Sequence, residues 1–149
     1  MSFPDADINF PSLIGRIALS KSCWNGQFDM VKLLCSKQKI NIINKPDSNN
    51  RTPLHNAVLG EFWGKEGKKM PAGSPTDSPE IVQLLIDNGA ELGIKNNNGN
   101  APFMISASTN GIKSMKILIK LNINLNEINT VYNGYFFLQW VFWKRKQIL

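Results

Sequence analysis

His55 is the only histidine in the chain, so it is the first residue to examine for acid–base or metal chemistry. A catalytic triad needs a nucleophile and a carboxylate beside the histidine, and a zinc site needs further ligands at suitable spacing. The sequence offers no such partners near His55, and Cys23 and Cys35 form no paired-thiol motif. The residue types therefore predict no catalysis, no metal site and no cofactor.

Phosphate binding is the other chemistry that a short motif suggests. The segment Gly60–Glu66, which reads GEFWGKE, combines glycines with a lysine as phosphate loops do. Its spacing differs from the phosphate-loop pattern, no Ser or Thr follows Lys65, and no strand precedes it. The sequence therefore does not predict a nucleotide site.

Charge and hydropathy exclude two further classes of function. Half of the net charge of +6 comes from Lys144, Arg145 and Lys146, so the rest of the chain is only weakly basic and nucleic-acid binding is not expected. No apolar run reaches the roughly 18 residues that a membrane-spanning helix needs.

Residues 1–10 lack the pattern of a signal peptide, which predicts a cytoplasmic protein with reduced thiols. The basic run 144–146 is shorter than the usual nuclear localisation signal, so a nuclear location remains an alternative to the cytoplasm.

A repeated pattern organises most of the chain. Ile17, Thr52 and Ala101 begin similar segments, and Phe136 begins a partial fourth copy. A second amphipathic helical pattern follows each of the first three copies, at 28–34, 79–86 and 115–119. The first and last steps of the repeat lie close to about 33 residues. The middle step is longer because a Gly-, Lys- and Pro-rich stretch, 60–78, separates the two helices of the second copy.

Local residue chemistry supports these helices. Thr52 and Ser78 are good N-cap residues, and each is followed by a proline, which fits the first helical position. Gly89 can close its helix in a left-handed conformation, and Asn98-Gly99 predicts a tight turn. We therefore expect an all-α solenoid of about three full helix–loop–helix repeats plus a partial fourth, because such units must stack to bury a core. The expected divisions are an N-terminal segment 1–11, repeats 12–48, 49–96 and 97–129, and a partial repeat with a basic tail at 130–149.

Two segments carry a family resemblance. Arg51–Ala57, which reads RTPLHNA, resembles the Thr-Pro-Leu-His-x-Ala signature of ankyrin repeats, and 81–92 is similar to their second helix and closing loop. The resemblance implies a solenoid without chemistry of its own, in which His55 ties the helix start to a neighbouring loop. It also implies that partners bind the concave side, made of loop tips and first helices. The implied tip residues are Arg16, Ser48, Asn49, Arg51, Asn97, Asn98 and Asn100, and the implied first-helix residues are Trp24, Asn25, Leu59, Ser108 and Thr109.

Three features keep more than one interpretation. Trp24 either contacts the partner, as exposed tryptophans often do, or covers the end of its helix. The insertion 60–78 is either a tolerated surface loop or a docking loop regulated by phosphorylation of Ser74. The aromatic segment 135–146 caps the third repeat, forms an interface for a partner, a membrane surface or a second copy in weak self-association, or marks a truncated or alternatively spliced form of a longer array.

The sequence thus predicts a protein-binding scaffold with another protein as its partner. Arg16 and Arg51 favour an acidic partner surface. One alternative is a small inhibitor that masks a transcription factor or another signalling protein. Another is a truncated isoform of a larger ankyrin-repeat protein.

Overall fold

The computed structural model describes residues 17–37, 42–59, 78–109 and 111–121, and the regular elements in these ranges are all helices. The helices are α1 (Ala18–Trp24), α2 (Phe28–Lys37), α3 (Pro53–Leu59), α4 (Pro79–Asp87), α5 (Pro102–Ser108) and α6 (Ile112–Lys120). The expected all-α helix-pair fold is therefore confirmed.

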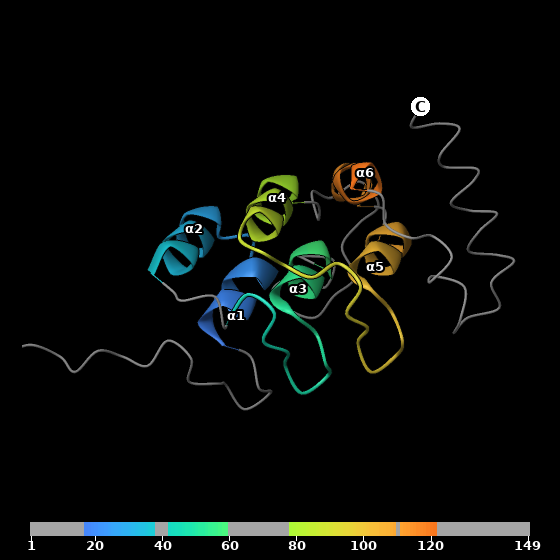
Figure 1. The fold of residues 1–149 in the computed structure, drawn as a ribbon, viewed down its shortest axis with the longest axis horizontal. Coiled ribbons are helices and arrows are strands. Elements are labelled where there is room, and N and C mark those ends of the chain that lie inside the picture. Colours follow the sequence, from blue (N-terminus) through green and yellow to red (C-terminus); the bar gives the residue numbers. More distant parts are fainter. Residues whose placement is uncertain (1–16, 38–41, 60–77, 110, 122–149) are drawn as a thin grey trace, which may run out of the picture.

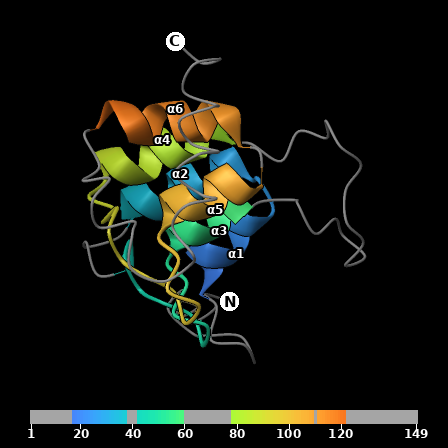
Figure 2. The ribbon, with the colours of Figure 1, turned by 90° about the vertical axis from the view of Figure 1, so that its right-hand side faces the viewer.

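The helices form two layers. Figure 1 shows α1, α3 and α5 side by side in one layer and α2, α4 and α6 in the other, and each helix packs on its neighbours in both directions. The loops that precede α3 and α5 project away from both layers, on the side of the first layer (Figures 1 and 2). This arrangement presents loop tips and first helices on one side, while the second layer forms the opposite side.

Helix ends follow from local chemistry. Ile17 and Ala101 have extended backbones directly before α1 and α5, as N-cap residues do. Gly89 adopts a φ of 89°, and two hydrogen bonds close α4 behind it, Gly89 N–H to Ile86 O and Ala90 N–H to Leu85 O. These bonds form a Schellman motif, as expected at a C-terminal glycine. Ser78 lies at the N-cap of α4 but its hydroxyl makes no capping bond, so Pro79 rather than a cap favours this helix start.

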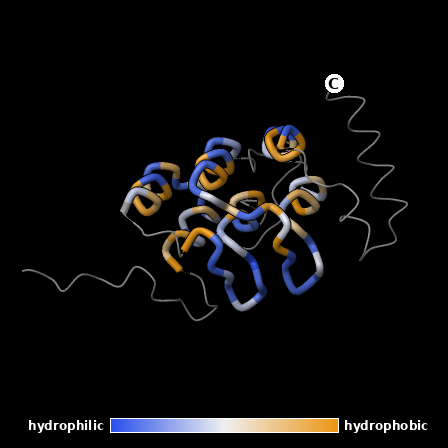
Figure 3. Tube along the Cα trace, viewed as in Figure 1, coloured by the Kyte–Doolittle hydropathy of each residue, from blue (hydrophilic) through white to orange (hydrophobic). Residues whose placement is uncertain are grey.

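One continuous apolar core lies between the two layers. Leu54 and Phe103 of the first layer meet Val82, Leu85 and Leu118 of the second, and all five are almost completely buried. In Figure 3 the hydrophobic positions concentrate on the helices, whereas the projecting loop tips are hydrophilic. Because no helix pair could bury this surface alone, the repeats stabilise one another.

The two cysteines belong to this core. Cys23 and Cys35 are both buried free thiols. Burial raises the pKa of both thiols, and for Cys23 the nearby Cys35 adds to the increase. Both side chains therefore stay protonated and apolar at neutral pH.

None of the described helices is long and apolar enough to cross a membrane.

Candidate protein-binding surface

The two loop tips share one hydrogen-bond pattern. The Asp47 carboxylate oxygen Oδ1 accepts the backbone N–H of Asn49 at 2.9 Å and of Arg51 at 3.0 Å. In the next repeat, Asn96 Oδ1 accepts the N–H of Asn98 at 2.9 Å and of Asn100 at 3.0 Å. A buried side-chain oxygen therefore fixes each tip from within, and the polar groups around it face outward.

Each tip turns tightly at a residue with positive φ. Asn50 has a φ of 56° and donates its N–H to Asp47 O at 2.9 Å, and Gly99 has a φ of 75° and donates to Asn96 O at 2.8 Å. Asparagine and glycine are the residues that tolerate this conformation best. The turn at Asn98-Gly99 is therefore confirmed, and the equivalent turn at Asn49-Asn50 uses an asparagine instead of a glycine.

Neighbouring tips are joined to one another. Asn97 donates its backbone N–H to Asn49 O at 3.0 Å and its side-chain amide to Ser48 O at 3.2 Å. The side-chain amide of Asn50 donates to Lys95 O at 2.6 Å. These bonds span two repeats, so the segments 47–51 and 95–100 form one continuous surface, which we call the loop-tip surface.

His55 connects this surface to α3. Its Nδ1 accepts the backbone N–H of Thr52 at 3.1 Å and lies 2.9 Å from the Thr52 hydroxyl. Since a backbone N–H can only donate, Nδ1 is the acceptor, and Nε2–H donates to Asn100 O at 3.0 Å. Burial lowers the pKa of His55 to about 4, and the nearby Arg51 charge lowers it further against the opposing bond to Asn100. The ring is therefore a neutral structural tie between repeats.

The residues that the resemblance implied as contacts have different exposures. Six are exposed, namely Asn25, Ser48, Asn49, Asn97, Asn98 and Ser108, and Trp24, Arg51 and Asn100 are half-buried. Leu59 and Thr109 are each only 8% exposed. The Thr109 hydroxyl donates to Ile105 O at 3.0 Å, so these two side chains offer little surface to a partner. Arg16 and Ser74 lie outside the described residues.

Sequence reasoning missed the side chains that shape this surface. Asp47 and Asn96 hold the tips. The only feature of the sequence that could have identified them is spacing, because each side chain accepts the backbone N–H groups of the residues two and four positions after it. Asn44 was also missed. Its side-chain amide donates to Gly89 O at 3.1 Å, and its oxygen accepts the N–H of Glu91 at 2.8 Å. Asn44 therefore joins the bases of the two loops.

The described residues contain no group of three or more His, Cys, Asp and Glu side chains that could hold a metal ion. The loop-tip surface consists instead of amide, hydroxyl and backbone groups with the positive charges of Arg51 and Lys95, and Lys45 adds a positive charge two residues before its first segment. Such groups donate and accept hydrogen bonds and attract carboxylates. This surface can therefore recognise a polar partner.

Comparisons with known proteins agree with this geometry. The ankyrin repeat family model matches residues 49–97. A protein of Rickettsia bellii (strain RML369-C) described as an ankyrin repeat protein is 27% identical over 119 residues, which are 78% of this chain and 15% of the relative. The transient receptor potential cation channel subfamily A member 1 of Drosophila melanogaster is 28% identical over 103 residues, which are 67% of this chain and 7% of the relative.

The chain thus spans a small part of the length of the curated relatives that it matches. The matched residues 49–97 begin with one loop tip, include α3 and α4, and reach into the next tip. Residues 49–97 therefore match the ankyrin repeat family, and the stacked helix pairs and the His55 tie between repeats agree with that match.

Proposed function

We propose that this chain binds another protein through the loop-tip surface and the adjoining ends of the first helices. Ankyrin repeats generally mediate protein–protein interactions, and stacked repeats offer extended surfaces for them. The observation that carries the proposal is the set of hydrogen bonds joining Asn97 to Ser48 and Asn49. These bonds order the tips before a partner arrives, so binding costs less conformational entropy.

The partner we propose is acidic on its contact surface. Lys45, Arg51 and Lys95 bring positive charge to the loops, while the Asp47 carboxylate is buried and accepts backbone N–H groups. Arginine pairs with carboxylates through a planar donor fork, and complementary charge speeds association. The chain has no catalytic role in this proposal, because its contact groups act only as hydrogen-bond partners and charges.

The test begins by purifying the partner with the full chain and then measures its affinity for variants. We expect Asn98→Glu, which adds a negative charge to the loop-tip surface, to weaken binding about tenfold. Ser36→Glu adds the same charge to the exposed side of α2 in the other layer, so it should leave affinity unchanged. Weakening by Ser36→Glu but not by Asn98→Glu would contradict the proposal.

The same purified partner distinguishes a scaffold from an inhibitor. If the chain masks a transcription factor, adding it should block the DNA binding of that partner in proportion to occupancy. A scaffold should leave the partner's own activity intact. We favour the scaffold, since the only acidic side chain of the loop-tip surface, Asp47, is buried, and the surface therefore presents positive and amide groups rather than the negative charge that would imitate DNA.

A further inference from the structure

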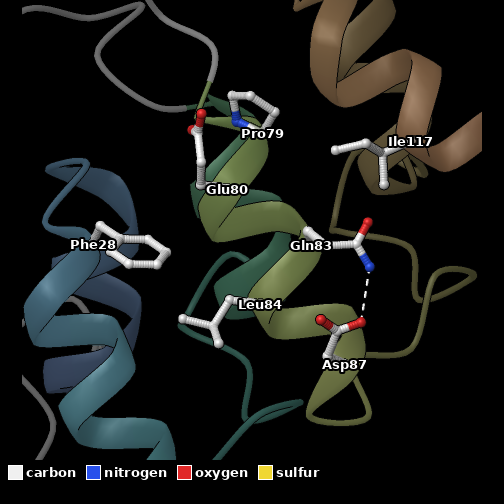
Figure 4. Close-up of a pocket in the computed structure, with 7 residues that line it drawn as sticks. All are labelled: Phe28, Pro79, Glu80, Gln83, Leu84, Asp87 and Ile117. Atoms are coloured by element: carbon white, nitrogen blue, oxygen red, sulfur yellow. Dashed lines mark hydrogen bonds between the residues drawn. The ribbon is translucent and has the colours of Figure 1, made fainter.

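A hollow lies on the side of the molecule opposite the loop-tip surface. It runs over α4 between α2 and α6 and has a volume of about 430 Å³. We call it the second-layer groove, and it is lined by Phe28, Pro79, Glu80, Gln83, Leu84, Asp87 and Ile117 (Figure 4). None of these residues belongs to the proposed contact surface.

Apolar side chains form much of the groove wall. Phe28 is 39% exposed at the start of α2, and it points toward the half-buried Leu84 of α4. Ile117 of α6 lies on the other side of α4 and is also half-buried. These side chains are partly exposed to solvent. Covering them with another apolar side chain removes apolar surface from water and therefore lowers the free energy.

The charged residues in the lining are both acidic. Glu80 and Asp87 are exposed, and they lie seven positions apart on α4, which places them on one face and about 10 Å apart along the axis. Gln83 donates its side-chain amide to Asp87 Oδ1 at 2.8 Å, which orients that carboxylate. The two charges in the lining are therefore opposite in sign to the net charge of +6 of the chain.

We propose that the second-layer groove binds an amphipathic helix of another protein that carries basic residues two turns apart and apolar residues between them. Side chains at i, i+3, i+4 and i+7 share one face of a helix, so this spacing matches the distance between Glu80 and Asp87. The apolar pair in the middle would cover Phe28 and Leu84. Helices bind apolar grooves in this way in other recognition modules.

The test uses a synthetic, fluorescently labelled alanine-based helix in which two lysines two turns apart flank a central pair of leucines. Its affinity for the full chain is measured by fluorescence anisotropy at low salt. We expect Glu80→Lys and Asp87→Lys each to weaken binding about fivefold, with a smaller effect at high salt. Glu91→Lys makes the same charge change in a loop outside the groove, and it should leave affinity unchanged.

A charge exchange completes the test. A peptide with glutamates in place of the two lysines should bind the Glu80→Lys/Asp87→Lys chain better than it binds the unchanged chain. Absence of lysine-peptide binding, equal effects of all three lysine variants, or failure of the exchange would each overturn the proposal. A concentration-dependent dimer that the double variant abolishes would identify a second copy of the chain as the occupant and would also overturn it.

Discussion

At the scale of the residue, His55 is the side chain whose environment decides its role most clearly. The fully buried ring accepts from Thr52 at one nitrogen and donates to Asn100 at the other. A proton added at Nδ1 would face the Thr52 N–H, so protonation breaks the bond to Thr52 at the start of α3, whereas Nε2–H can still donate to Asn100 O. The residue that looked most like a catalytic base is therefore a neutral part of the core.

This environment predicts a pH dependence of stability. The folded chain holds His55 neutral down to a pKa of about 4, whereas the unfolded chain binds the proton near pH 6.5. The contribution of His55 is therefore complete above about pH 6.5 and is lost as pH falls toward 4, by a few kcal/mol in total at ~1.4 kcal/mol per pKa unit. Urea unfolding at several pH values should show a shallower pH dependence in His55→Gln. Equal slopes for both chains would contradict the assignment.

The loop residues allow a second comparison between side chains. Asn96→Ala removes the oxygen that accepts two backbone N–H groups, so we expect a loss of about 1–3 kcal/mol of unfolding free energy. Asn98→Ala, at the exposed tip, should change stability by less than about 0.5 kcal/mol. Thermal unfolding of both variants would decide this. Equal stabilities would mean that Asn96 does not hold the tip.

The role of Asn96 also shows what a sequence can reveal about single residues. The resemblance to ankyrin repeats was enough to predict that His55 is structural. The turn at Asn98-Gly99 could be predicted because turn chemistry is local, and the structure shows Asn98 exposed there. The inward position of Asn96 depends on which of three successive asparagines turns into the loop, and composition alone does not specify that choice.

At the scale of the element, backbone conformation explains why particular glycines stand where they do. Gly89 has a φ of 89°, and a side chain added there would meet no atom within 4 Å. Any cost of a substitution must therefore come from backbone strain rather than from a clash. Gly93, four residues later, also has open space around it but lacks the positive φ.

The two glycines form a matched pair for mutation. Gly89→Ala should destabilise the chain by about 1–2 kcal/mol, because an L-residue is strained in the left-handed conformation. Gly93→Ala should be neutral or slightly stabilising, since it removes freedom only from the unfolded chain. Chemical denaturation of both variants measures the difference. A Gly89→Ala chain as stable as Gly93→Ala would contradict the Schellman closure of α4.

Helix starts and ends were the elements that the sequence predicted best, because a few adjacent residues determine them. Thr52-Pro53 begins α3, and Gly89 closes α4, as expected. The bridge from Asn44 to Gly89 and Glu91 could not be predicted, since it joins groups 45 and 47 positions apart. The second-layer groove could not be predicted for the same reason, since its lining residues come from three helices of three different repeats that are far apart in the sequence.

At the scale of the whole molecule, stacking makes the repeats depend on one another. Leu85 of α4 is completely buried in a core that runs through all six described helices. The sequence predicted this mutual dependence from the small size of each repeat. It could not predict that Leu59 and Thr109 would be buried, because their exposure depends on how closely adjacent first helices approach.

A core substitution tests this dependence. We expect Leu85→Ala to lower the unfolding free energy by about 2–5 kcal/mol, because it leaves a cavity in the centre of the array. Unfolding should remain a single transition by both circular dichroism and calorimetry, since neighbouring repeats lose their support together. Two separate transitions would show that the repeats unfold independently.

The most direct measurement for the chain as a protein-binding array is site-specific photo-crosslinking in cells. A photoreactive phenylalanine analogue replaces Asn98 on the loop-tip surface or Lys116 on the exposed side of α6, outside the second-layer groove. We expect a covalent adduct with one dominant protein from position 98 and none of that protein from position 116. An adduct with the same protein from position 116 but not from position 98 would contradict binding through the loop-tip surface.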